Sequence, residues 1–77
     1  MKKYNVPVLV EMDEDGKYIV SCPSLEGCYS QGDTFEEAMK NIKDVIKICL
    51  EEVEQSKKVI NLRYPEIIGV KYLEIAV

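Results

Sequence analysis

The chain contains no histidine, and its 77 residues include only three cysteines, three prolines and one phenylalanine. Without histidine, a histidine general base is excluded. The thiols also make a poor zinc site, because Cys22 and Cys28 are separated by five residues, which is not a usual spacing of zinc ligands. We therefore expect no metal or other cofactor, and we interpret the cysteines as small hydrophobic residues of the core.

Long basic stretches are missing as well. The net charge is −4, and basic residues adjoin one another only in the pairs Lys2-Lys3 and Lys57-Lys58. Binding to phosphate groups needs clustered lysine or arginine, so direct nucleic-acid binding is not expected. An acidic protein is better suited to a basic partner, because the opposite charges accelerate their encounter.

No apolar run approaches the ~20 residues that a membrane-spanning helix needs. The start, Met1-Lys2-Lys3, is not followed by the apolar region of a signal peptide. We therefore expect a soluble, cytoplasmic protein. Residues 1–77 suffice for a single domain with a small core. Such a domain is predicted to form a dimer or larger oligomer through its sheet edges or an open sheet face.

The clearest pattern is that of one long helix beginning at Thr34. Glu37 stands three residues after Thr34, which is the spacing of a helix capping box. Apolar residues then recur at steps of three and four, which places them on one helical face. Ile48 lies off that face, so it is either a tolerated surface residue or part of an oligomer contact. The face consists of Phe35, Ala38, Met39, Ile42, Val45, Ile46, Cys49, Leu50 and Val53.

Four extended segments accompany this helix. Residues 4–12 alternate in polarity, and a turn at Asp13-Glu14-Asp15-Gly16 returns the chain antiparallel over residues 17–22. A third strand is predicted over residues 28–31, and a fourth over residues 70–77. The first three strands should form a meander.

Handedness then predicts the order of the strands. A right-handed crossover through the helix would place the fourth strand parallel to the first and beside it. The predicted fold class is α+β: a mixed four-stranded sheet (β-β-β-α-β, order 3-2-1-4) with the helix on one face. No pattern assigns a conformation to residues 59–69. Either the segment 59–68 or a second subunit would cover the other face.

Two linked motifs resemble the HicB antitoxin family. The first is Cys22-Pro23-Ser24-Leu25-Glu26-Gly27-Cys28, which carries the pattern P-x-L-x-G-C, and the second is Gly32-Asp33-Thr34-Phe35-Glu36-Glu37-Ala38, which carries G-x-T-x-E-E-A. With the strands around them, they extend the likeness over about residues 4–52.

The resemblance implies a partial ribonuclease-H-like fold and the neutralisation of HicA toxins, which are small basic ribonucleases with a catalytic histidine. Many members of the family also carry a C-terminal DNA-binding domain that represses their operon. Because the sequence ends at Val77, we expect a short form without that domain.

The acidic cluster, the first motif and the short stretch between the two motifs supply the candidate partner-binding residues. Carboxylates at the first turn are either a soluble hairpin tip or groups that compete with RNA phosphates for a basic toxin. The loop and the helix start are explained by a tight turn followed by a cap, yet side chains there could also form part of a partner surface. The candidates are Glu11, Asp13, Glu14, Asp15, Glu26, Tyr29 and Gln31.

Three functions compete at this point. The leading hypothesis is an antitoxin that binds a HicA-like toxin ribonuclease and covers its RNA-binding and catalytic surface. The alternative is a stand-alone, non-catalytic, oligomeric binding module of the same fold. A ribonuclease-H-type enzyme is disfavoured, because mid-strand residues 8–10 are apolar and Glu11 is the nearest carboxylate.

Overall fold

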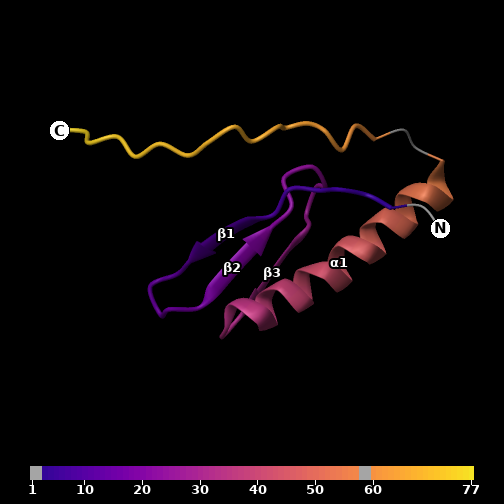
Figure 1. Cartoon of the computed structure of the whole chain (residues 1–77), viewed down its shortest axis with the longest axis horizontal. Helices are drawn as coiled ribbons and strands as arrows, with labels where there is room; N and C mark the ends of the chain where they lie inside the picture. Colours follow the sequence, from indigo (N-terminus) through magenta and orange to yellow (C-terminus); the bar gives the residue numbers. More distant parts are fainter. Residues whose placement is uncertain (1–2, 58–59) are drawn as a thin grey trace.

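The computed structural model describes residues 3–57 and 60–77. These residues form three strands and one long helix, namely β1 (Leu9–Met12), β2 (Tyr18–Ser21), β3 (Tyr29–Gly32) and α1 (Phe35–Ser56). The strands make one antiparallel sheet in the order β1-β2-β3, and α1 packs against β3 and β2 (Figure 1). The predicted α+β class and the order of the first three strands are confirmed.

The first turn sets the register of the β1–β2 hairpin. Gly16 adopts a φ of +82°, which few residues other than glycine tolerate. The Asp13 carboxylate closes the turn, because its Oδ1 accepts hydrogen bonds of 2.9 Å from the backbone N–H groups of Asp15 and Lys17. Met12 is thereby placed opposite Tyr18, and the predicted antiparallel return is confirmed.

The first strand is shorter than the alternating pattern predicts. Pairing begins only at Leu9, whose partner is Ser21, the last residue of β2. Beyond Ser21 the chain turns away, so residues 4–8 have no neighbouring strand, although Val6 and Val8 still pack against the core. The prediction of a strand over residues 4–12 was therefore wrong at its beginning.

The loop over residues 22–28 is closed by its own backbone. Cys22 N–H donates to the Cys28 carbonyl at 2.9 Å, and Leu25 N–H donates to the Cys22 carbonyl at 3.1 Å. Gly27 takes a φ of +71°, which lets the chain reverse. The side chains of Cys22, Leu25 and Cys28 are all buried, so the first motif forms one end of the core.

The helix begins as its pattern predicts, and most of its apolar face packs on the core, whereas Phe35 at its start is 45% exposed. Thr34 is the N-cap, and its Oγ1 accepts a 3.1 Å hydrogen bond from Glu37 N–H. Ala38, Ile42 and Ile46 are buried against Val20 of β2. Ile48 is exposed, as expected for a residue off the apolar face. Within the described residues, no helix combines the length and the apolar character needed to cross a membrane.

Residues 60–77 contain no strand or helix, so the fourth strand predicted over Val70–Val77 is not formed. The segment is attached at its beginning, where Ile60 and Leu62 pack on the core and Ser24 Oγ donates to the Leu62 carbonyl at 3.0 Å. It then runs past β1 without pairing to it (Figure 1). The prediction for Val59 lies outside the described residues.

The second motif brings β3 and α1 into close contact at Gly32. A Cβ atom on Gly32 would lie 2.5 Å from the backbone nitrogen of Ala38 and 2.9 Å from its Cα. Because these are backbone atoms of the first helical turn, they cannot move without moving the helix. Only glycine fits at this position.

Gly32→Ala should therefore destabilise the protein by about 2–3 kcal/mol, the upper range for forcing extra atoms into a packed site. The free energy of unfolding can be measured by urea denaturation. Gly69→Ala is the matched control, because a Cβ there meets nothing within 4 Å. Equal effects of the two substitutions would contradict the close contact.

Candidate partner-binding surface

The sheet has one face that α1 does not cover. Val20 points toward the helix, so side chains in register with its neighbours Ile19 and Ser21 point to the opposite side. Two rows of residues cross the three strands on this side. They are Glu11–Ile19–Gln31 and Leu9–Ser21–Tyr29, which together we call the open face.

Three of the seven candidate residues lie on the open face. Glu11 and Gln31 occupy the two ends of one row, and Tyr29 ends the other. All three are exposed, and Tyr29 is 69% exposed despite its size. An exposed aromatic residue next to polar side chains is typical of a protein-binding surface.

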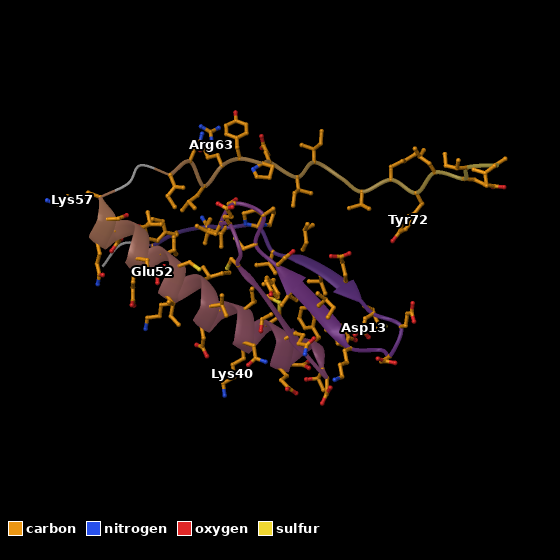
Figure 2. The ribbon with its side chains drawn as sticks, turned by 180° about the vertical axis from the view of Figure 1, so that it is seen from behind. Asp13, Lys40, Glu52, Lys57, Arg63 and Tyr72 are labelled. Carbon is orange, nitrogen blue, oxygen red and sulfur yellow. The ribbon has the colours of Figure 1, made fainter. Side chains whose placement is uncertain are left out.

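The acidic hairpin tip adjoins this face, at the turn between β1 and β2 (Figure 2). Glu14 and Asp15 are exposed there, whereas Asp13 is half-buried and holds the turn through its carboxylate. Asp13 has a structural role, and Glu14 and Asp15 extend the negative charge of Glu11 along the edge of the open face.

Glu26 lies apart from the other acidic candidates. It is exposed in the loop between β2 and β3, at the end of the sheet opposite the hairpin tip. The nearest candidate along the chain is Tyr29, which begins β3. The structure thus places the candidates along the length of the open face, with Glu26 and the hairpin tip at its two ends.

A groove between residues 4–8 and α1 was missed by the sequence reasoning. Its floor is apolar and its rim carries charges of both signs, and its two adjoining parts have volumes of about 550 and 810 Å³. The groove could have been predicted from the alternating polarity of residues 4–8, because the even-numbered side chains of this segment face the helix. The smaller part is lined by residues that include Tyr4, Val6, Val8, Met39, Lys43 and Ile46.

Tyr4 connects the groove to the far end of the helix. Its hydroxyl donates a hydrogen bond to Glu54 Oε1. This bond to a carboxylate raises the pKa of the Tyr4 phenol above its ordinary value, with smaller contributions from burial and from the negative charge of Glu54. The hydrogen bond links the N-terminal segment to the last turns of α1.

The three cysteines gather within the core. Burial raises the pKa of the Cys28 thiol to about 12, and the neighbouring thiols of Cys49 and Cys22 add to the increase. Such a thiol stays protonated at neutral pH, which disfavours both metal binding and nucleophilic chemistry. Within residues 3–57 and 60–77, no group of three or more cysteine and acidic residues is placed to hold a metal ion.

The comparisons with known proteins agree on one family. A family model described as a HicB-like antitoxin of a bacterial toxin–antitoxin system matches residues 6–69, which include both motifs. A UPF0150 protein of Synechocystis sp. is 56% identical over 54 residues, covering 70% of this chain and 78% of that protein. No solved structure matches significantly.

Two further relatives come from distant organisms. A UPF0150 protein of Archaeoglobus fulgidus is 40% identical over 68 residues, covering 88% of this chain and 90% of that protein. A UPF0150 protein of Helicobacter pylori is 43% identical over 49 residues, covering 64% of this chain and 67% of that protein.

The cysteine environment predicts a graded reaction with thiol reagents. Cys49 is half-buried, whereas Cys22 and Cys28 are buried. At pH 8 the native protein should take up one alkyl group quickly, at Cys49, and the denatured protein should take up three. Mass spectrometry after timed alkylation measures this. Rapid modification of Cys28 in the native protein would contradict its burial and its raised pKa.

Proposed function

Because the chain belongs to the HicB-like antitoxin family of bacterial toxin–antitoxin systems, we propose that it binds and neutralises a HicA-like, mRNA-cleaving toxin. In this proposal it covers the RNA-binding and catalytic surface of the toxin. It acts by binding, without catalysis of its own and without direct contact to nucleic acid. Its place of action is the cytoplasm, where a toxin that cleaves mRNA would act.

One arrangement carries this proposal: the open face joins exposed Glu11, Tyr29 and Gln31 to the acidic hairpin tip. A surface that binds RNA is basic, because it must neutralise phosphates. Carboxylates at Glu11, Glu14 and Asp15 offer the same charge as those phosphates and would compete for the same lysine and arginine side chains. Tyr29 supplies the apolar contact area that charge pairs alone do not provide.

The net charge of −4 supports the same partner. Opposite net charges steer two proteins together and raise their association rate, an effect that weakens as salt is added. An antitoxin benefits from fast association, since each free toxin molecule can cleave RNA until it is bound. We expect the complex to form more slowly and bind more weakly at high ionic strength.

The partial ribonuclease-H-like fold and the full strand order 3-2-1-4 remain part of this proposal. Three strands and the helix are in place, and the segment after Gly69 has the composition of the fourth strand. Its site beside β1 is unpaired among the described residues. We also propose the predicted dimer or larger oligomer. The unpaired edge of β1 is one place where its subunits could meet.

The groove favours a second function, that of a stand-alone, non-catalytic, oligomeric binding module. Its apolar floor would suit an apolar ligand, and its charged rim would suit a polar end on that ligand. The charged residues of the rim are Lys40, Lys43, Lys47, Glu51 and Glu54. This use does not involve the open face. The two functions therefore respond to substitutions on different surfaces.

The first experiment separates these functions. Tagged protein is isolated from its host, and the material that co-purifies is identified by mass spectrometry. The antitoxin proposal expects a stoichiometric small basic protein that is released by high salt and is toxic when expressed alone. If the protein comes down without any such partner, the binding-module alternative is favoured and bound small molecules should be sought.

Charge reversal on the open face should weaken the complex. We expect Glu11→Lys combined with Glu14→Lys to reduce affinity for the toxin at least about tenfold, since each tenfold loss corresponds to ~1.4 kcal/mol and several charge pairs are affected. The double variant Asp44→Lys and Glu52→Lys is the matched control. It makes the same change in net charge at two exposed positions of α1, of which Glu52 is labelled in Figure 2.

Isothermal titration calorimetry at two salt concentrations measures these affinities. The open-face variant should lose most of its salt dependence, whereas the helix variant should keep it. If both variants lose affinity equally, only net charge matters and the open face is not the contact surface.

A further inference from the structure

The C-terminal segment is extended and apolar, yet its side chains have little to pack against. Leu73 is 74% exposed and Ile75 is 72% exposed. A contiguous run of exposed apolar side chains marks an interaction site, because monomeric soluble proteins rarely expose large apolar patches to water. The large exposed residues of the segment are Ile67, Ile68, Val70, Tyr72, Leu73, Ile75 and Val77.

The segment lies beside the sheet of its own chain for part of its length but does not pair with it. Tyr72 points toward the sheet from the segment (Figure 2) and shares with Val10 and Met12 a space of about 390 Å³. The chain then continues beyond the hairpin turn, and its C-terminus lies past the end of β1 (Figure 1). Residues 73–77 pair with no strand among the described residues.

The overall dimensions of the chain are consistent with an extended C-terminal segment. The radius of gyration of the Cα atoms is 14.6 Å, and the longest extent is 47 Å. A compact domain of this length would have a radius of gyration of about 11.5 Å. The difference is consistent with a segment that reaches away from its own domain.

The outer edge of β1 offers a matching site. Among the described elements β1 contacts only β2, so its other edge has no paired strand. The helix packs against β2 and β3 and leaves the helix-side residues of β1 uncovered, with Val10 44% and Met12 59% exposed. The site thus combines unpaired backbone groups with apolar side chains, which together favour an added strand.

We propose that residues 69–77 of one copy pair with the outer edge of β1 in a second copy, and that the second copy returns the same contact. The resulting dimer has two-fold symmetry, and each sheet gains its fourth strand from its partner. In this arrangement the alternating residues Leu73, Ile75 and Val77 share one face of the added strand. They would cover Val10 and Met12 where α1 does not.

A second copy fits this site better than an unrelated peptide. Both halves of the contact, the exposed segment and the open edge, are present on the same chain. Reciprocal exchange covers both at once, whereas a foreign strand at β1 would leave the C-terminal segment exposed. Two-fold exchange also closes the assembly, so that no free edge remains to extend it into a fibre.

This association does not depend on the toxin. It involves the edge of β1 and the C-terminal segment, whereas the proposed toxin contact lies on the open face and the hairpin tip. A result that contradicts the dimer, obtained on the isolated full chain, would therefore leave the antitoxin proposal unaffected.

The first test is the mass of the full chain in solution. Light scattering after size-exclusion chromatography should give twice the chain mass of 8.8 kDa at micromolar concentration. Ile75→Lys should raise the dissociation constant at least tenfold and shift the mass toward a single chain. Ile48→Lys is the matched control, because it makes the same change at an exposed position of α1 and should leave the dimer intact.

The second test distinguishes exchange between chains from pairing within one chain. In a Cys49→Ser background, a tagged chain carrying Met12→Cys is refolded together with an untagged chain carrying Ile75→Cys. A short bismaleimide should link tagged to untagged chains. Neither chain can form this link alone, because each has only one exposed thiol.

The results decide the proposal in either direction. A cross-link between the two chains, together with a dimer that Ile75→Lys weakens, supports strand exchange. A single-chain mass for the native protein overturns it. So does a dimer that is insensitive to Ile75→Lys, or the absence of a cross-link between tagged and untagged chains.

Discussion

The contact between Gly32 and the first turn of α1 is the constraint on which the rest of the structure depends. With Ala38 backbone atoms less than 3 Å from where a Cβ would stand, β3 and the helix start form one rigid joint. The Thr34 cap fixes the direction in which the helix leaves it. As a result, α1 lies across β2 and β3, and Val20, Ala38 and Ile42 meet in the core.

The same joint leaves part of the sheet uncovered. A single helix held over β2 and β3 cannot also cover β1, so Val10 and Met12 remain exposed on the helix side. The opposite face has no helix at all among the described elements. In a chain of 77 residues the core is small, and completing these surfaces with other chains would add to its stability. The proposed toxin contact and the proposed dimer contact thus lie on different parts of the same incomplete sheet.

The two motifs that identify the family build the scaffold, and the candidate binding residues lie between or beside them. Leu25, Gly27 and Cys28 close the loop at one end of the core, and Gly32, Thr34 and Ala38 join sheet to helix. Tyr29 and Gln31 fall in the short strand between the motifs and point away from the core. The scaffold therefore presents these side chains without depending on them.

Local interactions allowed much of the fold to be predicted from the sequence. The helix, its Thr34 cap and the Gly16 turn each depend on residues a few positions apart, so their patterns sufficed. The candidate residues were also identified, but not their arrangement. That Glu11 and Gln31 share a row depends on the register of two strand pairs, which the pattern of a single strand does not specify.

Contacts between distant segments decided the rest. The first strand was predicted too long, because its alternation continues where β2 has already ended and no partner remains. The groove exists only because residues 4–8 then run beside α1. The sequence alone determined that residues 70–77 have the character of a strand. Only the tertiary structure decided that no strand forms there, since the segment runs past β1 and beyond its end without pairing to it.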